Sequence, residues 1–287
     1  MGKYNHKIEQ AQKTLGPSEA KLWLELSQAN RKTFNVNEVS TITGLREHAL
    51  SKFMYRLREK GLVTRLRSGL YNMVPFEMGY ESDYLGNPYI VAREIVNLKE
   101  KRKSSPYYIS HASAMDFHQM VTQPQLVIYT STTMRIKPHM IMGTEFHFVT
   151  CKSSHMFGMK KYWIDNTNQV YVSDLERTII DGLKMPQYCG GITEVAKGFW
   201  MKRNELDIVK MVNYAEKLNI GVIYRRLGFL LETYEINAPN EIDMLQRKIS
   251  KTYQLLDPTL PNEGKYNSKW RLRMNASTEE FLAVIRT

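Results

Sequence analysis

The chain has 287 residues, 43% of them hydrophobic, and a net charge of +11. This length accommodates one large domain or two ordinary ones, and we expect two. The longest apolar runs are too short to cross a bilayer and the N-terminus lacks the apolar core of a signal peptide, so we expect a cytoplasmic protein with no membrane partner. Cys151 and Cys189 form no CxxC pair, which argues against a disulfide framework and a thiolate zinc site.

The positive charge is concentrated near the N-terminus. Residues 1–76 contain 13 Lys and Arg against 6 Asp and Glu, whereas residues 77–287 contain 27 against 23. A basic segment of this kind is typical of a phosphate-binding surface, because counterion release favours its association with nucleic acid. The alternative is a basic surface that is merely solvated.

Three helices are predicted within the basic segment. Pro17 and Ser18 are start signals for a helix over residues 18–29. Asn35 and Glu38 have the spacing of a capping box, and Gly44 ends the helix that they begin. The third helix lies in "LREHALSKFMYRLREKG" and has a stripe that we expect in the core, consisting of Leu50, Phe53, Met54 and Leu57.

The opposite face of the third helix is polar, basic and aromatic. Two helices joined at a glycine, the second with such a face, are typical of a helix-turn-helix that enters the major groove. Alternating residues around Ser68 and Gly69 then predict a hairpin, the wing of a winged helix. On a regular strand, Arg65 and Arg67 would share one face and point at phosphates or the minor groove.

These positions predict a contact set for double-stranded DNA. We expect base-edge contacts from Arg46, Ser51, Lys52 and Tyr55, and phosphate contacts from His48, Arg56, Arg65 and Arg67. The alternatives are a winged helix used for protein contacts, and a Tyr55 ring that is half buried by packing. Glu59 on the same face would repel phosphate and limit insertion.

A change in composition over residues 76–86 predicts the domain boundary, giving a winged helix-turn-helix at 1–76 and a larger domain at 77–287. Patterning in the larger domain predicts both element types: helices at 88–98 and 110–120, a basic turn at 99–106, strands at 123–132, 144–151, 162–165 and 169–173, and a helix-rich stretch over 173–234. The predicted class is therefore α+β, with a mixed α and β second domain.

No motif in the second domain predicts an enzyme. His139, His147 and His155 lie near Cys151, but on predicted strands and loops, where packed histidines are commoner than metal ligands. Cys189 is expected to be a buried structural thiol. Phosphate-binding loops and a Gly-Ser dipeptide are absent from the sequence. We therefore predict no catalytic residues, no metal and no cofactor.

The carboxylates at the start of a predicted helix leave one enzymatic alternative. With Ser173 as N-cap, Asp174 and Glu176 occupy the first turn, where the helix dipole favours them. As a pair they would suit a magnesium ion in a nuclease or a nucleotidyl-transfer enzyme.

Other polar residues of the second domain are expected to be structural. Ser110 would cap a helix, and Gly190 and Gly191 would permit a turn between helices. Three arginines would either extend a basic DNA-facing surface or pair with buried acids: Arg177, Arg225 and Arg226. A second phosphate-contacting patch is predicted near the C-terminus at Lys265, Lys269, Arg271 and Arg273.

Several stretches together resemble a known family. They are "SGLYNMVP", "YYISHASAMDFH", "VYVSDLERTIIDGLKMPQYCGGITEVAKGFW", "YRRLGFLLE" and "LDPTLPNEGKYNSKWRLRMN". In this order, and over most of the chain, they look like the AbiEi antitoxin of type IV abortive-infection toxin-antitoxin systems.

The resemblance implies a two-domain phage-defence protein. In that family the winged helix represses its own operon by binding inverted repeats in the promoter. The C-terminal domain confers immunity to a cognate AbiEii toxin, which is nucleotidyltransferase-like, without forming a stable complex. The missing Gly-Ser dipeptide agrees with the antitoxin role rather than the toxin role.

Overall fold

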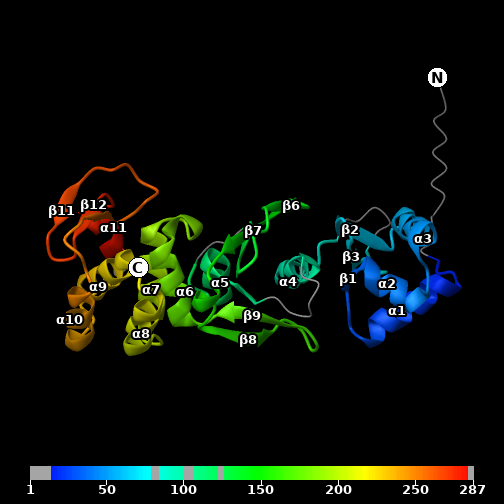
Figure 1. Ribbon diagram of the computed structural model, residues 1–287, viewed down its shortest axis with the longest axis horizontal. Coiled ribbons are helices and arrows are strands. Elements are labelled where there is room, and N and C mark those ends of the chain that lie inside the picture. The colour runs from blue at the N-terminus through cyan, green and yellow to red at the C-terminus, as the bar shows by residue number, and fades with distance from the viewer. Residues whose placement is uncertain (1–13, 79–83, 100–105, 122–125, 284–287) are drawn as a thin grey trace, which may run out of the picture. The chain divides into compact units, whose positions relative to one another are not determined.

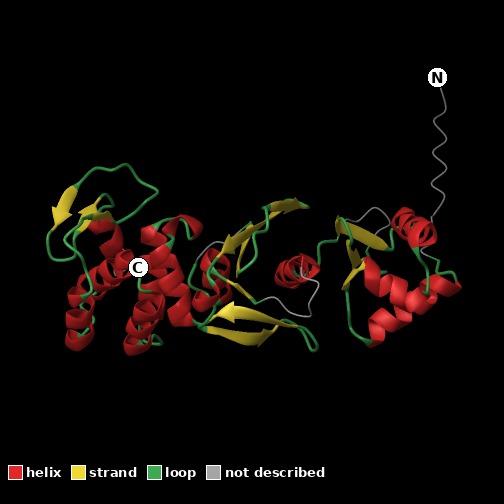
Figure 2. Cartoon of the chain, viewed as in Figure 1, coloured by secondary structure: helices red, strands yellow, loops and turns green. Residues whose placement is uncertain are grey.

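The computed structural model describes residues 14–78, 84–99, 106–121 and 126–283 (Figures 1 and 2). Contacts divide the chain into Met1–Lys103, here called unit 1, and Ser104–Thr287, here called unit 2. Both units contain helices and strands, which confirms the predicted mixed α and β class. Across the described ranges, no helix has the length and apolar character needed to span a bilayer.

Unit 1 combines helices with a small antiparallel sheet. Its elements are α1 (Pro17–Gln28), β1 (Thr33–Asn35), α2 (Val36–Thr43), α3 (Glu47–Glu59), β2 (Val63–Arg67), β3 (Leu70–Met73) and α4 (Pro88–Lys99). Within the described residues the sheet has the strand order β1-β3-β2. Strand β1 was not predicted from the sequence, because three residues are too few to show alternation.

Local signals define the helix ends in unit 1. The capping box of α2 is confirmed, since the Glu38 amide donates to Asn35 Oδ1 at 3.0 Å and the Asn35 amide donates to Glu38 Oε2 at 2.8 Å. Gly44 follows α2 with φ of 74°, a left-handed conformation that glycine adopts without steric cost. The start of α3 therefore depends on a turn specified by the sequence.

An apolar cluster packs α1 and α3 of unit 1 together. It includes the predicted stripe of α3, whose Leu50, Phe53, Met54 and Leu57 are all buried. Leu22, Trp23 and Leu26 of α1 lie in the same cluster. Burying this stripe fixes the rotation of α3, so its opposite face is turned to solvent.

Unit 1 extends beyond residue 76, where the sequence placed the domain boundary. Asn72 Nδ2 donates to the Tyr84 carbonyl at 3.3 Å, and the Tyr84 amide donates to Thr64 Oγ1 at 3.2 Å. Glu94 of α4 approaches Arg31 at 3.7 Å. These contacts place the segment from Tyr84 through α4 with unit 1. Residues 79–83 of the predicted boundary and 100–105 of the predicted basic turn lie outside the described residues.

Unit 2 is built around a mixed sheet, which has six strands within the described residues, in the order β6-β7-β5-β4-β9-β8. The strands are β4 (Tyr107–Ile109), β5 (Val127–Thr132), β6 (His139–Ile141), β7 (Thr144–Thr150), β8 (Met159–Trp163) and β9 (Gln169–Ser173). The pairs β4/β9 and β5/β7 are parallel, and the other neighbouring pairs are antiparallel. Strands β5, β7, β8 and β9 overlap the four predicted strands, whereas β4 and β6, of three residues each, were not predicted.

Helices supply most of the core of unit 2. They are α5 (His111–Phe117), α6 (Leu175–Lys184), α7 (Ile192–Lys202), α8 (Ile208–Leu218), α9 (Gly221–Thr233), α10 (Pro239–Arg247) and α11 (Thr278–Ala283), with short 3₁₀ turns at Ser153–His155 and Pro186–Tyr188. Every side chain of α6 from Glu176 to Leu183 is buried. Gly190 and Gly191, with φ of 83° and 103°, form the expected turn before α7.

A second, small sheet packs on α9 near the C-terminus. Its strands are β10 (Gln254–Leu255), β11 (Lys265–Asn267) and β12 (Leu272–Met274), with β12 in the middle. Trp270 is fully buried, and its Nε1 donates to Glu232 Oε2 at 2.7 Å. A Cβ at Gly228 of α9 would lie 2.0 Å from the Trp270 ring, so only glycine lets the indole reach the helix.

Candidate nucleic-acid interface

The predicted contact residues of α3 all lie on its solvent face. They are Arg46, His48, Ser51, Lys52, Tyr55 and Arg56, and each is exposed. Tyr55 is 59% exposed, which contradicts the alternative that its ring is half buried by packing. Glu59 is also exposed, so the basic face has an acidic end.

Side-chain hydrogen bonds hold the turn between α2 and α3. Ser40 Oγ donates to the Leu45 carbonyl at 2.7 Å, and Thr43 Oγ1 donates to the Val39 carbonyl at 2.7 Å. The Leu45 amide donates back to Thr43 Oγ1 at 3.3 Å. Together with Gly44, these bonds fix the angle at which α3 leaves α2, and a preorganised angle lowers the entropic cost of binding.

The hairpin after α3 separates its two arginines. Arg65 pairs with Tyr71 and Arg67 with Leu70, so β2 has a bulge between them. The expectation that both arginines share one face assumed regular alternation, which a bulge interrupts. Arg65 is exposed, whereas Arg67 is half buried and its Nη1 is enclosed with no hydrogen-bond partner among the described residues. Burial also lowers the pKa of the Arg67 guanidinium.

Lys60, the other basic residue before the hairpin, has a structural partner. Its Nζ lies 2.7 Å from Glu19 Oε2 and joins the end of α3 to α1. Burial raises the pKa of the Glu19 carboxyl, but the hydrogen bonds from Lys60 and the Gly16 amide outweigh it and hold that pKa below its ordinary value. Lys60 therefore stabilises unit 1 and is not part of the free charge of the α3 face.

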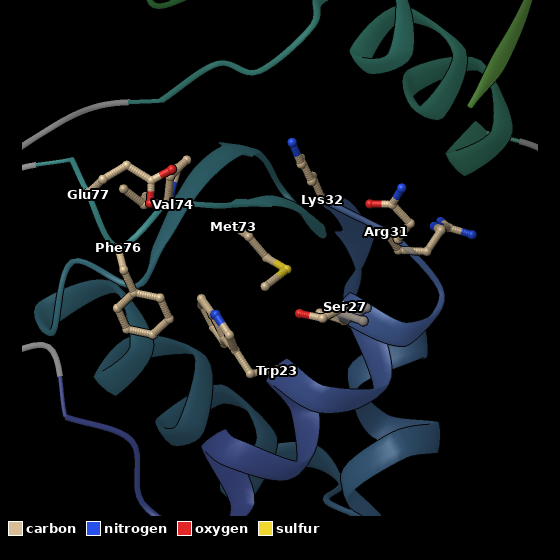
Figure 3. A pocket seen from close by; sticks show the side chains of 11 residues that line it. Trp23, Ser27, Arg31, Lys32, Met73, Val74, Phe76 and Glu77 are labelled. Carbon is tan, nitrogen blue, oxygen red and sulfur yellow. The ribbon is translucent and has the colours of Figure 1, made fainter. Parts of the chain in front are cut away.

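Unit 1 also has a cavity of about 250 Å³, which Figure 3 shows from close by. Trp23 of α1 and Phe76 pack edge to face beside it, with ring centroids 5.8 Å apart. Met73, Ser27 and Lys32 also line it. Its lining, drawn from described residues, includes none of the predicted DNA contacts, so the cavity is separate from the α3 face.

The predicted C-terminal patch is only partly free. Lys269 forms an ion pair with Glu232. Arg271 Nη1 donates to the Tyr253 hydroxyl at 3.1 Å, and Arg273 Nη1 donates to Asn262 Oδ1 at 2.7 Å. Lys265 is exposed. Two tyrosines that the sequence analysis did not select, Tyr253 and Tyr266, lie among these cations; their sequence separation hid the association.

The acids proposed for a metal are held by protein donors. Asp174, not Ser173, is the N-cap of α6, and its Oδ1 accepts from the Arg177 amide at 2.9 Å. Lys210 Nζ lies 2.9 Å from Asp174 Oδ2 and 2.7 Å from Glu176 Oε2. These contacts raise the pKa of Lys210 despite the opposing effect of its partial burial.

The other oxygens of the Asp174 and Glu176 carboxylates also accept hydrogen bonds from the protein. Tyr214 donates to Asp174 Oδ2 at 2.9 Å, and the Asp207 amide donates to Glu176 Oε1 at 3.2 Å. Every oxygen of the two carboxylates thus accepts a hydrogen bond from the protein. Their arrangement joins α6 to α8 and accounts for both acids without a ligand.

The three arginines that the sequence left undecided are buried. Arg177, Arg225 and Arg226 are each at most 3% exposed, so none extends a surface for DNA. Arg177 Nε lies 3.0 Å from Asp181 Oδ1. Arg226 donates instead to the carbonyls of Leu183, at 2.5 Å, and Leu255, at 3.0 Å.

Arg225 donates to the backbone carbonyls of Gly221, Ser250 and Thr252 and to the Ser250 hydroxyl. One of these arginines therefore forms an ion pair with a buried acid, as expected, and the other two connect helices and loops mainly through peptide oxygens. Charge-assisted bonds of this kind offset part of the cost of burying a guanidinium.

Ser110 occupies the N-cap position of α5 but does not cap it. Its Oγ bonds to His111 Nδ1 at 2.9 Å and accepts from Ser131 Oγ at 2.9 Å. Burial lowers the pKa of His111 to about 4, so the ring is neutral at pH 7. The expected capping role is replaced by a buried side-chain network.

The histidines and cysteines form no metal site within the described ranges, where no group of three or more His, Cys, Asp or Glu side chains is placed to hold an ion. Cys189 is buried, as predicted, and burial raises the pKa of its thiol far above the ordinary value. A thiol of this kind is a poor nucleophile.

Comparison with known proteins relates the chain to others at the level of fold. No protein-family profile matches it, and no curated protein is similar in sequence. Among solved structures, the RV2827C protein from Mycobacterium tuberculosis is similar, with a TM-score of 0.67 and 11% identity over 96% of each chain. The chain therefore shares its fold with this mycobacterial protein.

Proposed function

We propose that the chain is a transcriptional autorepressor whose unit 1 is a winged helix-turn-helix that binds double-stranded DNA. The observation that carries this proposal is the exposed basic and aromatic face of α3, opposite a buried apolar stripe. The element order supports it, because α2 and α3 are joined at a left-handed glycine and followed by the β2-β3 hairpin.

The residues of the α3 face have distinct proposed roles. Arg46, Ser51, Lys52 and Tyr55 contact base edges, and Lys52 or Arg46 pairs with guanine. His48, Arg56 and Arg65 contact phosphates, which position the helix without reading sequence. Arg67 keeps its assignment to phosphate, although its half-buried guanidinium leaves less of it for DNA.

We extend the proposal to an antitoxin of a type IV toxin-antitoxin system. This half rests on the resemblance of several stretches to the AbiEi family. Its functional partner is a cognate AbiEii-like nucleotidyltransferase toxin, which the antitoxin neutralises without a stable complex, and its DNA partner is the inverted repeat of its own promoter. The chain then acts by binding and not as an enzyme, in the cytoplasm.

The alternative of a metal-dependent nuclease or nucleotidyl-transfer domain gains no support from Asp174 and Glu176. Both carboxylates already accept hydrogen bonds from α6, α8 and Lys210. A metal would have to displace Lys210, whose ammonium occupies the space between them. We therefore do not propose it as a second function.

A gel-shift titration tests the DNA-binding half. The full chain is titrated against its own upstream DNA and a scrambled duplex of equal length, at two salt concentrations. We expect a preference for the upstream DNA that survives the higher salt. Lys52→Ala should cost about 1–3 kcal/mol on the upstream DNA and less on the scrambled duplex, because base contacts are lost only at the cognate site.

Lys160→Ala is the matched control, since Lys160 is an exposed lysine of unit 2. It should leave both titrations unchanged. Equal and steeply salt-sensitive binding to the two duplexes would reject the autorepressor. The antitoxin half is tested separately by co-expression with a nucleotidyltransferase-like neighbour, where unrelieved growth arrest would reject it.

A further inference from the structure

Four side chains form a continuous row on the small C-terminal sheet of unit 2. The Arg271 guanidinium carbon lies 5.4 Å from the Tyr253 ring centroid, the Tyr253 and Tyr266 centroids are 4.7 Å apart, and the Arg273 guanidinium carbon lies 5.3 Å from the Tyr266 centroid. We call Arg271, Tyr253, Tyr266 and Arg273 the Arg-Tyr row. Two aromatic rings thus lie between two cations.

The row lies on the solvent side of this sheet. Tyr266 pairs in register with Arg273 across β11 and β12, so these side chains share one face. Leu272, between the arginines, points the other way and is fully buried, as is Trp270. Tyr266 is 59% exposed and Tyr253 is 38% exposed. The tyrosines are therefore not needed to fill the core, and large parts of their rings meet water.

A concave surface accompanies the exposed rings. A cavity of about 220 Å³ is lined by Tyr253, Gln254, Leu255, Asn262, Tyr266 and Arg273. Arg273 Nε is enclosed and has no hydrogen-bond partner among the described residues. An acceptor on a ligand in the cavity would satisfy such a donor, whose isolation otherwise costs stability.

The surroundings add positive charge. Lys251, two residues before Tyr253, is exposed, as is the acid Glu263, whereas Lys265 precedes Tyr266 on β11 and therefore points to the other face of the sheet. Lys269 is neutralised by Glu232 and does not contribute. The surface therefore combines cations with flat aromatic rings, whereas a site for phosphate alone needs only the cations.

We propose that the Arg-Tyr row binds single-stranded nucleic acid. Unstacked bases stack on tyrosine rings, and the two arginines and Lys251 pair with the backbone phosphates. A duplex keeps its bases stacked on one another and offers the rings no free face. An acidic protein segment would use the cations but gain little from two exposed tyrosines. The proposal is independent of duplex binding by α3.

Fluorescence anisotropy tests the proposal on the full chain. The probe is a labelled single-stranded RNA of mixed sequence and about 12 nucleotides, within the range that such stacking sites cover. We expect Tyr253→Ala and Tyr266→Ala each to raise the Kd roughly tenfold or more, because each removes a stacking partner. Tyr266→Phe should bind close to the unaltered chain, since it keeps the ring.

Tyr171→Ala is the matched control. Tyr171 lies on the large sheet and is 36% exposed, and its ring centroid is 5.5 Å from Lys161 Nζ. It should leave RNA binding unchanged. Thermal unfolding of each variant shows whether it is folded. Where an alanine variant is not, Tyr253→Leu or Tyr266→Leu replaces it, because leucine keeps an apolar side chain without a ring to stack on. The Tyr253 and Tyr266 variants should retain the duplex affinity of the unaltered chain, which separates this result from the test of α3.

Three outcomes would overturn the proposal. One is the absence of measurable RNA binding by the unaltered chain. Another is binding weakened by Arg271→Ala and Arg273→Ala but not by either tyrosine variant, which would leave a phosphate site without stacking. The last is a poly-glutamate peptide that binds as tightly as the RNA and loses affinity equally in the tyrosine variants, which would assign the row to an acidic protein.

Discussion

Two ion pairs of this protein have the same sequence spacing, but one is buried and the other is exposed. Arg177 and Asp181 form an ion pair that is almost fully buried, with Tyr108 bonded to both. Burial opposes ionisation of Asp181, but Arg177 holds the pKa of that carboxyl below its ordinary value. Asp243 and Arg247 have the same four-residue spacing on α10, yet both are exposed.

Arg177 and Arg247, one from each ion pair, allow a matched test at the residue scale. Arg177→Met should lower the free energy of unfolding by about 3–5 kcal/mol, because it leaves the Asp181 charge buried without its partner. Arg247→Ala should lower it by at most about 1 kcal/mol, since water screens an exposed pair. Urea titrations followed by circular dichroism measure both. Equal effects would show that the interior of unit 2 solvates Asp181 without Arg177.

At the scale of elements, the end of α3 and the following hairpin place their basic residues in different environments. Lys60 pairs with Glu19 and joins α3 to α1. Arg65 is exposed on β2, and the bulge sets Arg67 apart in a half-buried environment. One short stretch therefore contains an ion-paired lysine and an exposed arginine only a few positions apart.

The two roles predict different responses to salt. Arg65→Ala should weaken binding to upstream and scrambled duplexes alike and lower the slope of log K against log salt by about one, as expected for one lost phosphate contact. Lys60→Ala should leave that slope unchanged and destabilise unit 1 instead. Titrations at several salt concentrations, with thermal unfolding of each variant, measure both. If Arg65→Ala leaves the slope of log K against log salt unchanged, the proposal that the hairpin contacts DNA is wrong.

For the whole molecule, the division into units sets where the chain can be cut. Contacts place α4 with unit 1, and Tyr84 hydrogen-bonds to both Thr64 and Asn72.

The fold is also shared over 96% of the chain with a mycobacterial protein at 11% identity. Such a fold tolerates wide sequence change, because it requires a pattern of buried positions more than particular side chains.

A truncation series tests this division. The fragment 1–103 should unfold cooperatively and retain duplex binding, because it keeps α4. The fragment 1–76 should be less stable by at least about 1 kcal/mol, since it loses the Tyr84 hydrogen bonds and the packing of α4. Thermal unfolding and gel shifts on both fragments measure this. Identical stability would show that unit 1 ends at the boundary predicted from the sequence.

The sequence by itself determined the local structure of unit 1. The capping box at Asn35 and Glu38, the left-handed Gly44 and the apolar stripe of α3 act over a few residues, so they can be recognised without the fold. The same stripe also determined which α3 side chains are exposed, because the two faces of a helix are linked by its period. The predicted DNA-contact residues of α3 follow from that rule.

Only the tertiary structure decided the features that join distant residues. It buried Arg177, Arg225 and Arg226, placed Lys210 between Asp174 and Glu176, and paired the three-residue strand β1 with β3. It also brought Tyr253 beside Tyr266 and placed both between arginines. The physical reason is that burial and side-chain partners depend on which elements pack together, and no periodic pattern along the chain records a contact between positions far apart in sequence.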